Sequence, residues 1–102
     1  MSQSSKLIKD LAEDCIRLRA AAQQVRGTAV RLSPPDTSAR DTAQAIIDRL
    51  TTIIRFTNDH HRQADAHRKV ARHRSTLEEC RLVLNQLVPQ LQMDPAKLAI
   101  AL

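Results

Sequence analysis

The sequence predicts an all-α protein, and three observations support this fold class. The 102 residues contain one glycine and four prolines, so long stretches carry nothing that would interrupt a helix. Apolar residues recur at alternating spacings of three and four, which is the pattern of helices that pack against one another. Strict alternation of apolar and polar residues, which would indicate a strand, is missing. The length is that of a single domain, residues 1–102.

The first helix is expected at about residues 5–32. Its apolar seam consists of Ile8, Leu11, Cys15, Leu18, Ala22, Val25, Ala29 and Leu32. Three further apolar residues are expected to widen this face, namely Leu7, Ile16 and Val30. Gly27 is expected to weaken or end the last turn, because glycine costs roughly 1 kcal/mol in a helix interior. Pro34 and Pro35 then stop the helix.

The second helix is expected at about residues 38–74, a stretch without glycine or proline that would be about 55 Å long. Asp36 or Ser38 can start it. Its first half carries an apolar stripe of Ala43, Ile46, Leu50 and Ile53, flanked by Ile47 and Ile54. The short connection makes the first two helices an antiparallel hairpin.

A third helix is expected at about residues 76–91. Ser75 and Thr76 are each followed three residues later by a glutamate, which indicates a helix start and therefore a break near Arg74. The seam of this helix is Leu77, Cys80, Leu84, Leu87 and Leu91. Pro89 kinks or ends it. The short C-terminal segment 95–102 is apolar enough to need a docking site.

Three long apolar seams exceed what one helical hairpin can cover, so we expect a homodimer with a core like that of a four-helix bundle. Cys15 and Cys80 fall on these seams, and we expect them to be buried, reduced thiols.

The positive charge of the chain is concentrated in one segment. The formal net charge is +5, and residues 55–74 alone carry six basic and two acidic side chains. A local excess of this kind favours an anionic partner, although an exposed, solvated helix face is the simpler alternative.

On a continuous second helix, Arg55, Arg62 and Lys69 would form one stripe, because residues seven apart lie nearly above one another. The residues expected to contact an anionic partner are Arg40, Gln44, Thr51, Arg55, Asn58, Arg62, Arg68, Lys69, Arg72 and His73. Single strands are usually held by bases stacked on aromatic side chains, and the chain has one aromatic residue, Phe56. A long cationic face therefore favours a duplex that is recognised by its backbone and shape.

Other function classes lack their motifs. The four histidines lack the spacing of a helical zinc site, and no nucleophile elbow or phosphate loop occurs. We therefore expect no enzymatic activity, no metal and no cofactor. The longest apolar runs are too short to span a membrane, and the N-terminus has acidic residues where a signal peptide needs an apolar core. We expect a soluble, cytoplasmic protein.

Several short stretches resemble a known family. They are Ser-Lys-Leu at 5–7, the alanines at 20–22 followed by Gly27, the Pro34-Pro35 turn, and Ala-Arg-Asp at 39–41. Over roughly residues 5–72 the chain resembles the nodavirus suppressors of RNA silencing, which are small helical dimers that bind double-stranded RNA. The third helix expected here is longer than that of the family.

The resemblance implies a function and a mechanism. Arg40 would match an arginine that contacts RNA at the start of the second helix. An antiparallel dimer would lie along A-form RNA in the cytoplasm of a host cell, and would shield the duplex from cleavage and from loading by host silencing proteins. The alternative is a helical adaptor whose seams and apolar tail engage partner proteins and whose charge keeps it soluble.

Overall fold

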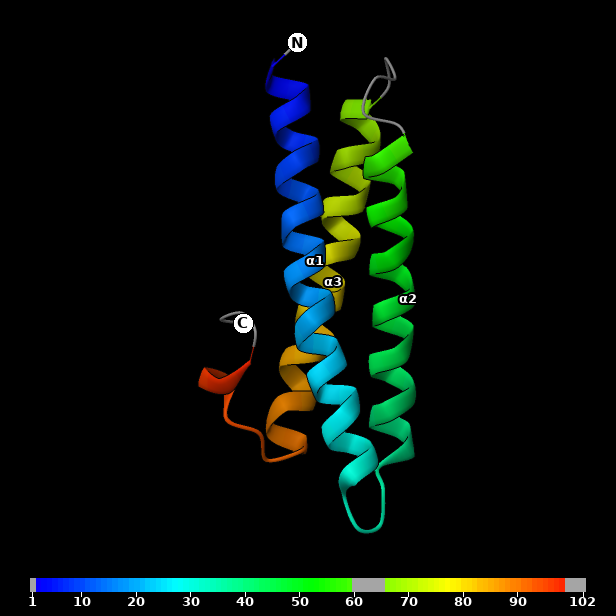
Figure 1. Cartoon of the computed structure of the whole chain (residues 1–102), viewed down its shortest axis with the longest axis vertical. Coiled ribbons are helices and arrows are strands. Elements are labelled where there is room, and N and C mark those ends of the chain that lie inside the picture. The colour runs from blue at the N-terminus through cyan, green and yellow to red at the C-terminus, as the bar shows by residue number, and fades with distance from the viewer. Residues whose placement is uncertain (1, 60–65, 99–102) are drawn as a thin grey trace.

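The computed structural model describes residues 2–59 and 66–98, and this part of the chain is all-α, as predicted. Its elements in order are the helices α1 (Ser2–Arg31), α2 (Thr37–Asp59) and α3 (Ala66–Gln90), and the short 3-10 helix η1 (Pro95–Lys97). α1 and α2 form the expected antiparallel hairpin, and α3 packs against both of them (Figure 1). The molecule is a rod whose Cα atoms extend over 51 × 23 × 17 Å.

The hairpin turn is closed by Asp36. Its Oδ1 accepts a hydrogen bond from the Ala39 backbone N–H at 3.0 Å, so of the two starts expected for the second helix it is Asp36 that acts as the cap. The Asp36 backbone N–H in turn donates to the carbonyl of Ala29, at the end of α1, at 3.0 Å. α1 continues through Gly27 to Arg31, close to the predicted end at about residue 32, and the last turn does not end at the glycine. Val25 and Ala29 on either side of it are fully buried, and their packing offsets the cost of glycine.

The predicted continuous helix at 38–74 is wrong. The predicted third helix is confirmed, but it begins at Ala66 and not at about residue 76. α2 ends at Asp59, and the residues from Ala66 onward belong to α3, which runs in the opposite direction to α2 (Figure 1). Asn58 and Asp59 are residue types that favour helix ends, because their side chains compete for backbone hydrogen bonds. The reversal also buries Val70, which a continuous helix would carry past the end of the hairpin.

Ser75 and Thr76, expected to cap a new helix, lie inside α3. The Thr76 hydroxyl donates to the carbonyl of Arg72 at 3.4 Å, one turn earlier, which is a common arrangement for threonine within a helix. A serine or threonine followed by glutamate therefore did not mark a helix start here.

The core runs the length of the bundle and contains the predicted seams except Leu32, with Ala21, Ala39, Phe56, Val70 and Val88 in addition. From α1 it contains Ile8, Leu11, Cys15, Leu18, Ala21, Ala22, Val25 and Ala29; from α2, Ala39, Ala43, Ile46, Ile47, Leu50, Ile53 and Phe56; and from α3, Val70, Leu77, Cys80, Leu84, Leu87 and Val88, with Leu91 following. Seams from all three helices thus cover one another within a single chain. A second chain is not needed for this purpose, and the homodimer stays a prediction.

Some apolar side chains expected on the core face are exposed instead. Leu7, Ile16 and Val30 on α1 are 42%, 47% and 45% exposed, and Leu32 also lies at the surface. Ile16 and Val30 point more than about 90° away from the α1 seam at 100° per residue, so α2 and α3 do not reach them. Leu82 on α3 is 62% exposed. These residues leave apolar surface on the outside of the bundle.

α3 ends as Pro89 predicts, one residue after the proline. The Met93 N–H donates to the carbonyl of Val88, and the Gln92 N–H donates to the carbonyl of Pro89, both at 3.0 Å. This is a Schellman motif, in which Gln92 takes the left-handed conformation with φ 57°.

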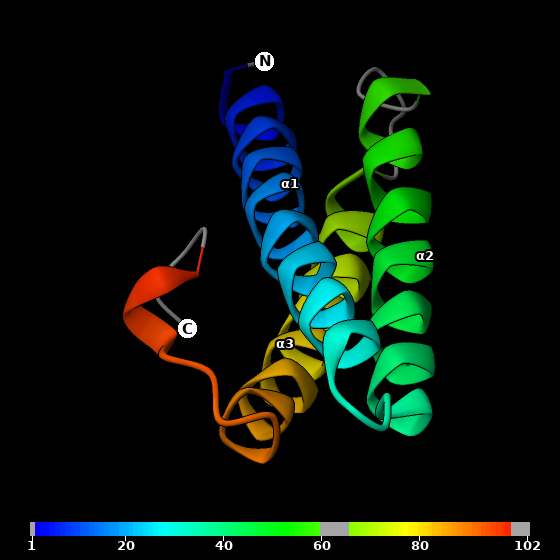
Figure 2. The same cartoon turned by 60° about the horizontal axis from the view of Figure 1, so that its bottom comes forward.

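The chain then turns back beside α1, on the side away from α2 (Figure 2). Met93 and Leu98 pack against the core, and the Gln24 side chain on α1 donates to the carbonyl of Lys97 at 3.2 Å. The expected docking of the C-terminal segment is thus seen for its described part; residues 99–102 lie outside the described residues. No helix in the described ranges combines the length and the apolar character needed to cross a membrane.

Candidate nucleic-acid interface

The residues predicted to contact an anionic partner are divided between two helices. Those on α2 are Arg40, Gln44, Thr51, Arg55 and Asn58; those on α3 are Arg68, Lys69, Arg72 and His73. Arg62 lies outside the described residues. The predicted stripe through Arg55 and Lys69 required one continuous helix, and it is wrong because these two residues lie on antiparallel helices.

The α2 residues lie on a face to which α1 also contributes. Arg26 Nη1 donates to Gln44 Oε1 at 2.5 Å, and Arg19 Nη1 donates to Thr51 Oγ1 at 3.2 Å. The two donors are seven residues apart on α1, and the two acceptors are seven residues apart on α2. The two hydrogen bonds therefore join the antiparallel helices at positions two turns apart. We call this surface the α1–α2 face and define it by Arg19, Arg26, Arg40, Gln44, Thr51, Arg55 and Asn58.

The electrostatics of the α1–α2 face favour an anion. The acceptors for Arg19 and Arg26 are a hydroxyl and a carboxamide, so the positive charges of these arginines are held in place and not neutralised. Arg40 forms an exposed ion pair with Asp41 at 2.9 Å. The Gln44 amide donates to Asp48 at 3.0 Å. Four arginines against these two aspartates leave a net positive face.

Arg19 and Arg26 were missed by the sequence reasoning, although a signal existed. Each follows a seam residue, Leu18 or Val25, so each lies at the edge of the packed face of α1. Residues at this edge flank the neighbouring helix. Whether Arg19 and Arg26 flank α2 or α3 depends on the side of the hairpin on which α3 packs. The residue pattern of α1 alone does not predict that side.

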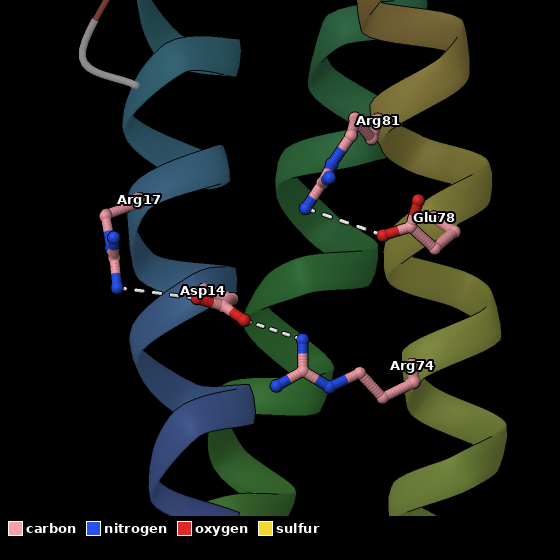
Figure 3. Close-up of polar contacts among 5 residues, drawn as sticks. All are labelled: Asp14, Arg17, Arg74, Glu78 and Arg81. Atoms are coloured by element: carbon pink, nitrogen blue, oxygen red, sulfur yellow. Dashed lines mark hydrogen bonds and ion pairs between the residues drawn. The ribbon is translucent and has the colours of Figure 1, made fainter. Parts of the chain in front are cut away.

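The opposite side of α1 faces α3, and its charges are paired. Asp14 lies between two arginines: its Oδ2 accepts from Arg74 Nη1 at 2.6 Å and its Oδ1 accepts from Arg17 Nη2 at 3.4 Å (Figure 3). Further along α3, Arg81 pairs with Glu78 at 3.5 Å. On this side, two carboxylates thus pair with three arginines.

Of the α3 residues of the predicted set, His73 contacts α2. Arg68 and Arg72 are exposed, whereas Lys69 and His73 are half-buried. The His73 ring lies against Phe56 of α2, with ring centroids 4.6 Å apart. Burial first, and then the positive charges of Arg72 and Lys69, lower the pKa of His73.

A groove of about 510 Å³ lies between the C-terminal half of α1 and the chain after α3. Gly27 forms part of its wall, where an added Cβ would lie 3.2 Å from Arg31 Nη1. Arg31 and Lys97 contribute positive charges, Asp94 a negative one. The mixture does not select a ligand class. Within the described residues, no three His, Cys, Asp or Glu side chains come together to hold a metal ion.

Comparison with protein-family models, with curated proteins and with solved structures finds no match for this chain.

Proposed function

We propose that this protein binds double-stranded RNA independently of sequence, through the α1–α2 face. The observation that carries the proposal is the pair of cross-helix hydrogen bonds, Arg26 to Gln44 and Arg19 to Thr51. They hold two α1 cations beside a row of cations and polar groups on α2. From Arg40 to Arg55 this row extends about 22 Å, at about 1.5 Å per residue. A straight face of that length suits successive phosphates along a duplex.

The available chemistry favours a duplex over a single strand. Phe56, the one aromatic residue, is only 8% exposed and lies against His73. A base therefore cannot stack on it, and this favours a duplex over a single strand. The polar side chains of the face, among them Gln44, Thr51 and Asn58, can hydrogen-bond to 2′-hydroxyls. Such groups line the wide, shallow minor groove of A-form RNA, which distinguishes it from DNA.

The resemblance to nodavirus suppressors of RNA silencing suggests the biological role. A protein that covers duplex RNA without regard to sequence would shield it from cleavage and from loading by host silencing proteins. We further propose that the chain acts as a homodimer, since Ile16, Val30 and Leu82 leave apolar surface outside the bundle. Light scattering at micromolar concentration tests this, and a monomer mass would count against the dimer.

The binding proposal is tested by fluorescence anisotropy with random-sequence RNA duplex, the matching single strand and a DNA duplex. We expect the RNA duplex to bind most tightly, and its affinity to fall steeply between about 50 mM and about 200 mM salt. Equal affinity for the single strand, or a marked preference for one duplex sequence, would contradict the proposal.

One observation favours a second candidate function, a helical adaptor for protein partners. The same exposed apolar residues, Leu82 above all, could contact another protein rather than a second copy. This function predicts no affinity for RNA duplex at any salt concentration.

A further inference from the structure

A second basic site lies between α2 and α3, apart from the α1–α2 face. It is a groove of about 230 Å³, which we call the α2–α3 groove, and its lining residues are Arg49, Thr52, Ile53, His73 and Thr76. Four of these five carry a group that can donate a hydrogen bond: a guanidinium, an imidazole and two hydroxyls. None of the five is acidic. The groove thus offers several hydrogen-bond donors and one guanidinium beside the apolar side chain of Ile53.

The polar groups are held where a ligand could reach them. The Thr52 hydroxyl donates to the carbonyl of Asp48 at 3.1 Å, and the Thr76 hydroxyl donates to the carbonyl of Arg72 at 3.4 Å. The second bond is long, so the Thr76 hydroxyl can turn to an anion at little cost. The His73 imidazole is held by its contact with the Phe56 ring.

Positive charge surrounds the His73 imidazole. Lys69 and Arg72 approach it from its own helix, and Arg49 lines the same groove from α2. An acidic group also lies near the groove: Glu79, whose carboxylate pairs with Arg49 at 3.4 Å and is 62% exposed. An exposed pair of this length contributes little, so Arg49 can turn from Glu79 to a ligand.

We propose that the α2–α3 groove binds a phosphate group, held by Arg49 with Thr52, His73 and Thr76 as further donors. A guanidinium presents paired N–H groups that match phosphate oxygens. The groove volume is several times the roughly 30 Å³ that one water molecule occupies in the liquid, so a phosphate fits. The group could belong to a nucleic-acid backbone or to a free phosphate compound, since both present the same oxygens. The site does not depend on duplex binding by the α1–α2 face.

The imidazole of His73 is the reporter for the test. Its NMR signal is assigned with the His73→Asn variant, and its pH titration is followed with inorganic phosphate and with chloride at equal ionic strength. A bound phosphate places negative charge beside the ring and favours the protonated form, so the pKa of His73 is expected to rise with phosphate and not with chloride. No difference between the two salts would overturn the proposal.

Two matched variants separate a specific site from general attraction. Arg49→Gln removes the proposed ligand, and Arg81→Gln is the control, because both arginines form a long ion pair with a glutamate of α3, at 3.4 Å and 3.5 Å. Arg49→Gln should weaken phosphate binding about tenfold or more, as expected for a lost hydrogen bond to a charged group. Arg81→Gln should leave it unchanged. Equal losses in both variants would show general electrostatic attraction and refute the site.

A final arm identifies the source of the phosphate. RNA duplex is added in place of inorganic phosphate, and the His73 signal is followed in the unaltered chain and in Arg49→Gln. A shift that needs Arg49 assigns the groove to the nucleic-acid backbone. A response to inorganic phosphate but not to RNA assigns it to a free phosphate compound. If neither ligand moves the signal, the groove is not a phosphate site, whatever the α1–α2 face binds.

Discussion

Arg26 of α1 and Gln44 of α2 meet across the hairpin, with Arg26 Nη1 and Gln44 Oε1 2.5 Å apart. The contact positions a cation without neutralising it, because the acceptor is an uncharged carboxamide. Seven residues away on each helix, Arg19 and Thr51 repeat the arrangement. The hairpin therefore presents arginines of both helices on one surface, and the first prediction tests what they do.

Replacing Arg19 and Arg26 together with alanine is expected to weaken binding to RNA duplexes of all sequences alike. Each lost phosphate contact should lower the slope of log affinity against log salt by about one, so the double variant should lose about two. Anisotropy titrations at several salt concentrations measure both quantities.

Arg17→Ala is the matched control for this experiment. Arg17 lies on the same helix, but its side chain is 61% exposed and pairs with Asp14 on the side that faces α3. Its removal should leave the affinity and the salt slope nearly unchanged. If Arg17→Ala and the double variant reduce binding equally, the α1–α2 face is not the interface.

Leu50 lies fully buried at the centre of α2, so truncating it should leave a cavity. Leu50→Ala is expected to lower the free energy of unfolding by about 2–5 kcal/mol. Leu82→Ala removes the same atoms from an exposed position and should change the free energy of unfolding by less than about 0.5 kcal/mol. Urea unfolding followed by circular dichroism compares them, and similar losses would mean that Leu82 is also buried, as in a dimer. Leu50→Asp should unfold the chain.

Asp36 should make the stability depend on pH. Hydrogen bonds from the Ala39 backbone and from the Gln90 side chain hold the pKa of Asp36 below its usual value of 3.8. Such a carboxylate stabilises the folded chain above the unfolded-state pKa, and this contribution is lost as the pH falls through the lower, folded-state value. Asp36→Asn keeps a capping side chain without the charge. Its Tm should therefore lie below that of the unaltered chain at neutral pH, and the gap should close below pH 3.8.

The cysteines should react slowly while the chain is folded. Both are fully buried, and burial raises the pKa of the Cys15 thiol from 9.0 to about 12. At neutral pH this lowers its thiolate fraction about a thousandfold, and the thiolate is the form that reacts with iodoacetamide. Mass spectrometry should detect labelling only after urea is added. Fast labelling of Cys15 or Cys80 without denaturant would show that the core opens readily.

Gln92 should be a site where glycine stabilises the protein. Its left-handed φ of 57° disfavours residues with a Cβ, whereas glycine adopts it freely. Gln92→Gly is expected to raise the free energy of unfolding by about 0.5–1 kcal/mol. Gln92→Ala retains the Cβ and should bring no such gain. An equal gain from alanine would point to the loss of the glutamine side chain as the cause.

The sequence by itself determined the all-α class, most of the seams and the turn that joins the two helices of the hairpin. These features are local: the spacing of Ile8, Leu11 and Cys15 defines one face of a helix whatever packs on it, and Asp36 caps with its own side chain. Gly27 stays inside α1 because packing by flanking residues outweighs a local preference of roughly 1 kcal/mol.

Only the tertiary structure decided where the basic residues lie. Between Asp59 and Ala66 the chain reverses without a glycine or proline to mark it, and α3 covers the hairpin because doing so removes its apolar seam from water. That reversal separates Arg55 from Lys69, pairs Arg74 with Asp14, and leaves the opposite flank of the hairpin open for Arg19 and Arg26. Helix periodicity relates residues within one helix, whereas the composition of a surface shared by two helices depends on which helices are neighbours.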